Sequence, residues 1–210
     1  MGIYLNPGND LFAQALSSEI YVDKSMLIRL TNERLNSNDR HICISRPRRF
    51  GKSMAANMLV AYYSRNCDSK ELFSSLAIAD TLDFEDHLNK YNVIHLDMTR
   101  FASKAPDVKG MIDRLELTLK QELSELCADI SYPDFYSSDE ILTLIYNKYR
   151  IPFVFIIDEW DCVFRIHKND IEGQTAYLDY LKILLKDRPY VALDLSLIHI
   201  SEPTRLALIS

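Results

Sequence analysis

The sequence has no excess of basic residues, no long apolar run and no paired cysteines, and each absence excludes a class of protein. With 24 Lys and Arg against 30 Asp and Glu, the formal net charge is −6, so no global positive field recruits nucleic acid or an anionic membrane. No apolar run reaches the length of about 18 residues that a membrane-spanning helix needs. The four cysteines are far apart and lack the CxxC or Cys/His spacing of a metal site, so buried, reduced thiols are predicted.

The amino terminus lacks the signals that would send the chain elsewhere. MGIYLNPGND has no charged stretch followed by an apolar one, as a secretory signal would. Asn6 stands where a myristoylation signal needs Ser or Thr. Since 48% of the 210 residues are hydrophobic and 26% are charged, the chain has a globular composition and can bury a core. A cytoplasmic protein without a membrane partner is therefore predicted.

Short apolar runs alternate with amphipathic stretches along the chain. Three runs predict buried strands, namely HICIS (41–45), YNVIHLDMT (91–99) and IPFVFIIDEWD (151–161). Apolar residues at helical spacing predict helices over 52–64, 105–130, 137–149 and 174–187. In the third of these, Ser137 and Glu140 have the spacing of a capping box. The alternation predicts an α/β fold with a mainly parallel sheet covered by helices.

The loop after the first predicted strand resembles a phosphate-binding loop. Its end, GKS, matches the Walker A pattern GxxxxGK[ST], in which backbone N–H groups surround the phosphates, the Lys reaches them and the hydroxyl binds Mg²⁺. The first glycine of the pattern is replaced by an arginine, but the second keeps the close approach of the backbone to the phosphates. The predicted nucleotide-binding residues are Arg46, Pro47, Arg48, Arg49, Phe50, Gly51, Lys52, Ser53 and Met54.

The arginines of this loop allow two interpretations. Arg46, Arg48 and Arg49 would either pair with phosphate oxygens or bind acidic neighbours such as Asp23 or Asp161. The sequence leaves both open. A DNA-binding patch is not expected, because no aromatic or basic stripe continues the three arginines.

Two carboxylates, Asp158 and Glu159, close the third apolar run, which is the Walker B pattern. Parallel α/β sheets bind their ligands at the carboxyl ends of the strands. Asp158, together with Ser53, is therefore predicted to hold Mg²⁺, and Glu159 to orient the attacking water. A strand that merely ends in acidic surface residues is the alternative. The pair follows Lys52 by about a hundred residues, in the order that a P-loop NTPase requires, so Lys52 and Glu159 are the predicted catalytic residues.

ATP is the predicted nucleotide. The stretches NKYN and NKYR, which start at Asn89 and Asn147, lack the aspartate of the NKxD motif that reads guanine. A glutamate beside the strand-end aspartate suits hydrolysis better than phosphoryl transfer to a small acceptor. Asp97, at the end of the second predicted strand, is a weaker candidate for the same edge of the sheet, and His95 is expected to be a core histidine.

Three stretches, IYVDKSMLI, SRPRRFGKSM and IIDEWD, resemble the bacterial AAA-ATPase-like family, and the similarity extends over nearly all of residues 1–194. That family carries arginine at the first Walker A position, so the resemblance implies that Arg46 does not mark an inactive loop. It often has Tyr where Trp160 stands. It further implies that the YVDK element, Tyr21–Lys24, packs near the adenine or braces the loop; a structural strand is the alternative.

The resemblance also implies more than this chain contains. In that family the ATPase-like region is usually followed by a nuclease-like domain, which would be the effector in the same chain and the sole route to nucleic acid. From Leu195 the sequence reads LSLIHISEPTR, which is what a sequencing-library adapter encodes when it is translated in frame. Residues 1–194 are therefore predicted to be an incomplete P-loop domain and 195–210 an artefactual tail, with a genuine short strand as the alternative. The strand carrying a sensor residue and any arginine finger would then be missing.

Three functions remain in competition at this point. The first is an ATP-binding and ATP-hydrolysing switch that controls the attached effector domain, with hydrolysis by this fragment alone in doubt. The second is a non-hydrolysing, nucleotide-binding interaction module. The third, less favoured because no basic lid segment is evident, is a small-molecule kinase. An oligomer is compatible with each of them.

Overall fold

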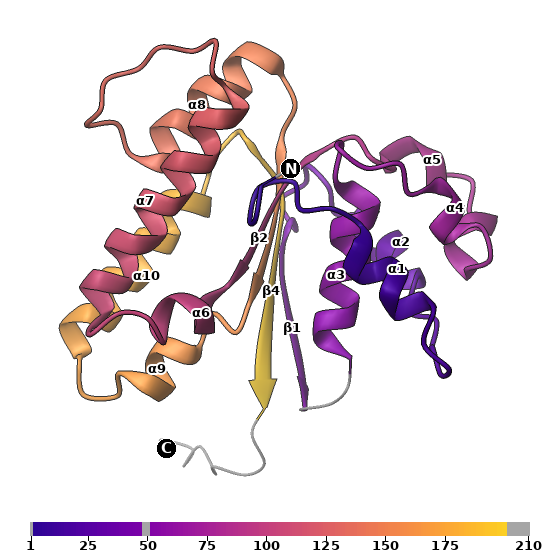
Figure 1. Cartoon of the computed structure of the whole chain (residues 1–210), viewed down its shortest axis with the longest axis horizontal. Helices are drawn as coiled ribbons and strands as arrows, with labels where there is room; N and C mark the ends of the chain where they lie inside the picture. The colour runs from indigo at the N-terminus through magenta and orange to yellow at the C-terminus, as the bar shows by residue number, and fades with distance from the viewer. Residues whose placement is uncertain (1, 48–50, 201–210) are drawn as a thin grey trace.

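A single parallel sheet organises the chain. The structure, a computed structural model, describes residues 2–47 and 51–200, and the side chains of 46, 47 and 198–200 lie outside this description. Four strands pair in the order β1-β4-β3-β2, and all neighbours are parallel. Their bounds are His41–Pro47 (β1), Asn92–Asp97 (β2), Phe153–Asp158 (β3) and Val191–Ile200 (β4). Figure 1 shows the sheet between two layers of helices, which confirms the predicted α/β fold.

One layer comes from the first half of the chain and is built around α3 (Figure 1). Its members are α1 (Asp10–Leu16), α2 (Met26–Asn32), α3 (Lys52–Tyr63), α4 (Lys70–Phe73), the 3-10 helix η1 (Ala77–Asp80) and α5 (Phe84–His87). The predicted helix over 52–64 is confirmed. The elements between 65 and 90 were not predicted, because helices of four residues are too short to show a helical period.

The other layer comes from the second half of the chain. Its members are α6 (Met98–Ala102), α7 (Val108–Leu126), α8 (Ser138–Tyr149), α9 (Cys162–Ile166) and α10 (Ile171–Leu185). The three long helices α7, α8 and α10 confirm the predictions. The capping box at the start of α8 is also present, since the Ser137 backbone N–H donates to Glu140 Oε2 over 2.8 Å.

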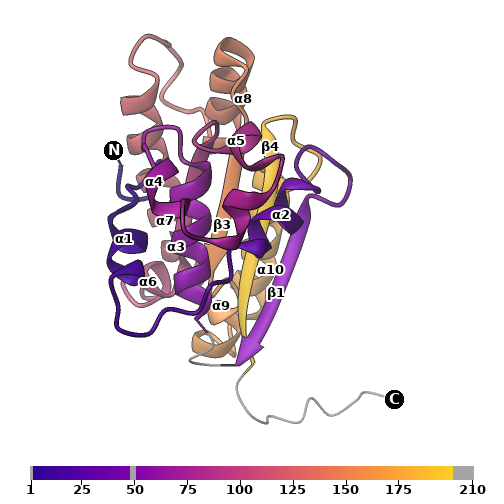
Figure 2. The same cartoon turned by 90° about the vertical axis from the view of Figure 1, so that its right-hand side faces the viewer.

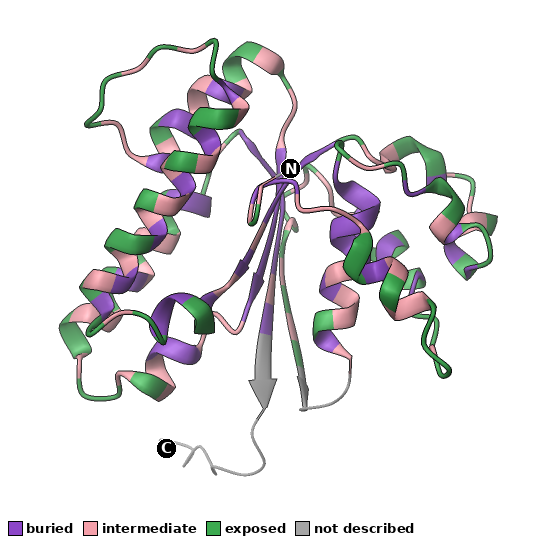
Figure 3. Cartoon of the chain, in the orientation of Figure 1, coloured by how far each residue is buried: buried purple, intermediate pink, exposed green. Residues whose placement is uncertain are grey.

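The sheet separates two apolar cores, and β3 contributes to both. Phe153, Phe155 and Ile157 pack on the α7–α8–α10 side, whereas Val154 and Ile156 pack on the α3 side. This is the alternation expected of a strand with two buried faces. Figure 3 shows buried residues along both sides of the sheet. The strand that ends at Asp158, directly before Glu159, is therefore packed on both of its faces.

The prediction that HICIS is a buried strand is wrong for one of its faces. In the described structure β1 lies at the edge of the sheet (Figure 2), and His41, Cys43 and Ser45 are exposed while Ile42 and Ile44 are half-buried. All four cysteines are free thiols. The expectation of buried cysteines holds for Cys127 and Cys162 but fails for Cys43, because alternate residues of an edge strand face outward.

Residues 195–200, the first part of the tail predicted to be artefactual, lie in β4. Residues 195–200 continue the strand from Val191, and Leu195 and Leu197 are buried on the α3 side of the sheet. Leu and Ile alternating with Ser and His suit a strand whatever their origin. The proposed origin of residues 195–210 stays a prediction about the gene. Reading the source genome past the codon for Asp194 should give a different but apolar continuation, whereas an in-frame LSLIHISEPTRLALIS would contradict it.

Within the residues that the structure describes, no helix is both long enough and apolar enough to cross a bilayer.

Candidate functional site

The carboxyl ends of the strands bring together residues that are far apart in sequence. In the register of the sheet, Asp97 of β2 lies beside Asp158 of β3, and Asp158 lies beside Leu197 of β4. The chain leaves β1 at the same edge and begins α3 at Lys52. Because a parallel sheet exposes its ligand-binding edge there, both predicted motifs open onto one region.

Gly51 lies immediately before α3 in a left-handed conformation. Its φ is +72° and its ψ is +32°, a region that only glycine adopts readily. A Cβ at this position would lie 2.9 Å from Lys24 Nζ, so a side chain would also push that ammonium away. Gly51 thus allows a tight entry into the helix and a close approach of Lys24. The residues before it, 48–50, lie outside the described part of the chain.

Replacing Gly51 by Ala is expected to weaken nucleotide binding about tenfold or more, since the loop must either leave its left-handed conformation or carry strain of about 1 kcal/mol or more. Titration calorimetry with ATP and Mg²⁺ measures the effect. Gly110→Ala is the matched control, because Gly110 lies in α7 at a negative φ. Equal affinities of the wild type and Gly51→Ala would contradict a role of this glycine in the site.

Lys52 and Glu159 form a buried ion pair between the two motifs. Lys52 Nζ lies 3.6 Å from Glu159 Oε1, and the two side chains are only 6% and 15% exposed. An ammonium is rarely buried without a counter-charge. At the start of α3, Lys52 lies where the helix dipole and backbone N–H groups favour anions.

Ser53 and Asp158 meet beside this pair. The Ser53 hydroxyl donates to Asp158 Oδ2 over 3.3 Å, whereas Asp158 Oδ1 is buried and has no hydrogen-bond partner among the described residues. Burial raises the pKa of Asp158, and the charge of Glu159 raises it further. A nearby cation would stabilise the charged form of this buried carboxylate. Ser53 Oγ and the Asp158 carboxylate therefore fit Mg²⁺, which prefers hard oxygen ligands and keeps several waters.

Protein side chains alone do not build a metal cage here. Among residues 2–47 and 51–200, no group of three or more His, Cys, Asp or Glu side chains is placed to hold a metal ion. Beside phosphates, Mg²⁺ is usually bound through one or two protein oxygens, with water and phosphate completing the shell.

The backbone turns sharply at Glu159, directly after β3. Its φ is +54°, which is uncommon for a residue other than glycine and often marks a functional site. The turn is closed because the Glu159 N–H donates to the Leu197 carbonyl (3.1 Å) and the Cys162 N–H donates to the Glu159 carbonyl (2.9 Å). The Glu159 carboxylate also accepts a hydrogen bond from Arg165 of α9. This side chain is therefore held by its backbone and by two cations.

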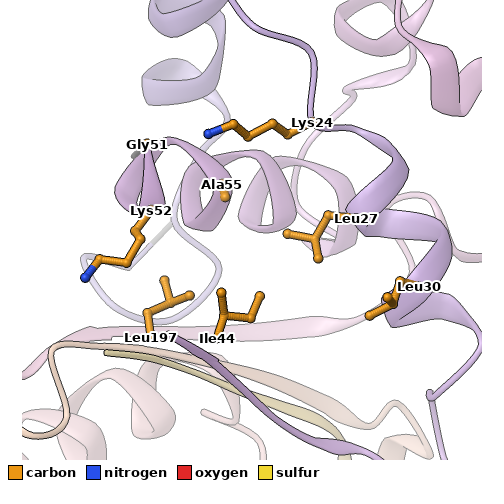
Figure 4. A pocket seen from close by; sticks show the side chains of 8 residues that line it. All are labelled: Lys24, Leu27, Leu30, Ile44, Gly51, Lys52, Ala55 and Leu197. Carbon is orange, nitrogen blue, oxygen red and sulfur yellow. The ribbon is translucent and has the colours of Figure 1, made fainter. Parts of the chain in front are cut away.

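An apolar cavity adjoins the predicted phosphate loop. It measures about 520 Å³ and is lined by side chains of α2, α3, β1 and β4, namely Leu27, Leu30, Ala55, Ile44 and Leu197. Lys24, Gly51 and Lys52 also line it, and Figure 4 shows Lys24 reaching across to Gly51. A hollow that is apolar inside and cationic at one side has the character of a small-molecule site.

The last residue of the YVDK element, Lys24, lies at the candidate site beside Gly51. Tyr21–Lys24 forms no strand in the structure, so the alternative of a structural strand is wrong. The Asp23 carboxylate accepts from the N–H groups of Ser25 (2.7 Å) and Ala77 (2.9 Å). Burial alone would raise the pKa of Asp23, but these hydrogen bonds outweigh it and lower the pKa. Asp23 thereby anchors the segment that places Lys24 beside Gly51.

The structure brings some of the predicted residues together and is silent on others. Gly51, Lys52, Ser53, Asp158 and Glu159 share one site. Met54 lies half-buried in the first turn of α3. Nothing is described of Arg48, Arg49 and Phe50, nor of the side chains of Arg46 and Pro47. The described partners of Asp23 and Asp161 are backbone N–H groups and Arg165, respectively.

The sequence also singled out Asp97 and His95, whereas it did not single out Arg165. Asp97 reaches the expected edge, but its carboxylate accepts from the Thr99 N–H (3.0 Å) and lies 3.6 Å from Arg100 Nε, so it caps α6. His95 is half-buried, so the expectation of a core histidine holds only in part, and burial lowers its pKa. The residue that sequence reasoning missed is Arg165, whose signal was its i,i+4 spacing to Asp161.

Comparisons with known proteins place the chain in a family. A search of curated proteins finds no match. Among solved structures, the chain matches that of PCH-2 from C. elegans with 14% sequence identity and a TM-score of 0.35, covering 95% of this chain and 39% of that one. At that TM-score the likeness carries no argument. The family model for predicted AAA-ATPases matches residues 12–191, most of the sequence. The chain therefore belongs to the AAA-ATPase-like family.

Proposed function

We propose that this chain binds Mg²⁺-ATP and hydrolyses it, as a nucleotide-dependent switch for an effector domain in a longer protein. One observation carries the proposal. Ser53 contacts Asp158 while Lys52 pairs with Glu159, so the two motifs predicted from separate parts of the sequence meet side chain to side chain. Family membership supports nucleotide binding in general. The effector domain rests on the resemblance of residues 1–194 to proteins that carry one.

The ATP phosphates would lie at the amino terminus of α3. Lys52 would then exchange part of its contact with Glu159 for the β- and γ-phosphates. Lys24, beside Gly51, adds a second positive charge at the same helix start. The apolar cavity is large enough for the nucleobase and lies next to these cations, which supports a single pocket for base and phosphates.

Mg²⁺ would be held by Ser53 Oγ and Asp158, the two oxygens that already approach each other. When bound, the ion would offset the negative charge of the phosphates and of Asp158. The protein's own part is to hold the buried Asp158 carboxylate at the end of β3, between two apolar cores, opposite the Ser53 hydroxyl of α3.

Glu159 would orient the attacking water and accept its proton. The water oxygen forms a bond to the γ-phosphorus while the bond from that phosphorus to the β–γ bridging oxygen breaks, and ADP leaves with the electron pair. The proton passes through Glu159 to solvent, so ATP and water give ADP, phosphate and a proton. The Glu159 side chain is 15% exposed, which limits the access of bulk water to its carboxylate.

A non-hydrolysing interaction module is the second candidate, and one observation favours it. In the described structure both carboxylate oxygens of Glu159 face cations, Lys52 on one side and Arg165 on the other. If nucleotide binding left both contacts in place, Glu159 would not reach a water molecule, and the chain would bind without turnover.

Binding and product analysis separate these functions. ATP titrated into the full-length protein encoded by the gene should bind with micromolar affinity in Mg²⁺ and more weakly in EDTA. Chromatography should then show ADP and phosphate without any added acceptor. Binding without product would support the interaction module, and ADP formed only with an acceptor would support a kinase. No saturable binding in either buffer would overturn the proposal.

A further inference from the structure

We propose that Arg165 is the positioning residue that holds Glu159 in place for hydrolysis, an inference that rests on the proposed function. Arg165 lies on α9 and belongs to neither predicted motif. Its Nη2 donates to Glu159 Oε2, and its Nε lies 3.3 Å from Asp161 Oδ2. One guanidinium thus connects the two carboxylates that follow the end of β3.

The two oxygens of Glu159 face different cations, and this division suggests different roles. Oε1 lies 3.6 Å from Lys52 Nζ, whereas Oε2 accepts from Arg165. Lys52 starts α3 and lines the cavity, so the phosphates compete for it directly. Arg165 is not among the cavity-lining residues. Nucleotide binding is therefore expected to weaken the contact between Oε1 and Lys52 and to leave the contact between Oε2 and Arg165 intact. Oε1 can then accept from a water molecule while Arg165 holds Oε2.

The backbone on either side of Glu159 and the start of α9 are fixed by packing. The Tyr177 hydroxyl of α10 donates to the Trp160 carbonyl over 3.0 Å, and Cys162 is buried at the start of α9. These contacts tie the turn after β3 to the helix layer. The guanidinium also forms an ion pair with Asp161, four residues earlier, at 3.3 Å between Nε and Oδ2. A carboxylate that hydrogen-bonds to a fixed guanidinium loses little further freedom when it must align a water molecule.

The charges around Glu159 also support a positioning role for Arg165. Asp158, Glu159 and Asp161 place three carboxylates within four residues, and the described cations against them are Lys52 and Arg165. When Lys52 turns toward the phosphates, Arg165 remains to offset the repulsion between Glu159 and its acidic neighbours. Without it, the Glu159 side chain is expected to turn away from Asp158 and lose the alignment that attack requires.

The test is a double-mutant cycle in the full-length protein. Arg165→Met should lower the ATP turnover number about tenfold or more and leave the dissociation constant of Mg²⁺-ATP unchanged. Arg165→Lys, which keeps the charge, should recover part of the loss. In a Glu159→Gln background, Arg165→Met should change turnover by less than about twofold, because residues that act as a unit are not additive. Arg114→Met, on the exposed face of α7, is the matched control.

The outcomes distinguish the inference from the function beneath it. A wild-type protein without turnover overturns the proposed function, and this inference with it. Wild-type turnover together with an equally active or faster Arg165→Met protein overturns the inference alone, and faster turnover would make Arg165 a restraint on Glu159. A parallel loss of ATP affinity, or an undiminished effect in the Glu159→Gln background, would show a merely structural role.

Discussion

Glu159→Gln is expected to lower ATP turnover by about 100-fold or more while ATP affinity is retained. The amide keeps the size of the side chain and one acceptor oxygen, but it cannot accept the proton of the attacking water, and loss of a general base costs about 10²–10⁴-fold. Binding is retained because Lys52, Ser53 and the start of α3 are unchanged. Phosphate release and calorimetric titration, measured on the same preparation, give both quantities.

The control is the same chemical change elsewhere. Glu172 is exposed in the first turn of α10 and belongs to neither motif, so Glu172→Gln removes an equal charge outside the candidate site residues. It should leave turnover and affinity unaltered. Undiminished turnover in Glu159→Gln would remove Glu159 from the assigned role, whatever the control shows.

Lys52→Ala is expected to abolish or strongly weaken ATP binding. A hydrogen bond to a charged group contributes about 1.5–3 kcal/mol, so losing the contact to the phosphates should raise the dissociation constant about 10- to 100-fold. The change also leaves Glu159 facing Arg165 alone, with one buried negative charge less well balanced. The expected result is therefore loss of binding with a fall in thermal stability, measured by calorimetry and by a melting curve.

Lys70→Ala separates loss of a site residue from loss of a lysine. Lys70 makes an ion pair with Glu85 at the surface, where both side chains are more than half exposed. Exposed pairs of this kind contribute little to stability. The control should bind ATP like the wild type, and a Lys52→Ala protein that matches it in affinity would contradict the phosphate-binding role.

The predictions from sequence succeeded where a local pattern decides the outcome. The buried run 153–157 has alternating side chains for two cores, and Ser137 with Glu140 specifies a helix start without help from the rest of the chain. The residues GKS and DE were predicted to share a site because phosphate binding needs those groups at those spacings; the structure brings their side chains together, and their roles stay predictions. Such signals lie within a few neighbouring residues.

What could not be predicted depends on long-range neighbours. That β1 lies at the edge of the sheet follows from β4 pairing between β1 and β3, so Cys43 is exposed although its own sequence reads as buried. Likewise, nothing around Lys24 indicates that it approaches Gly51, and nothing around Arg165 indicates that it bonds to Glu159. Each contact joins elements whose packing only the folded chain defines.

The central claim is that the carboxyl end of β3 and the start of α3 form one ATP-hydrolysing site. Phosphate release from ATP tests it most directly. The full-length wild-type protein should release phosphate continuously in Mg²⁺ and stop when EDTA is added. Phosphate release that does not depend on Mg²⁺, or none at all from a folded protein that binds ATP, would contradict the account.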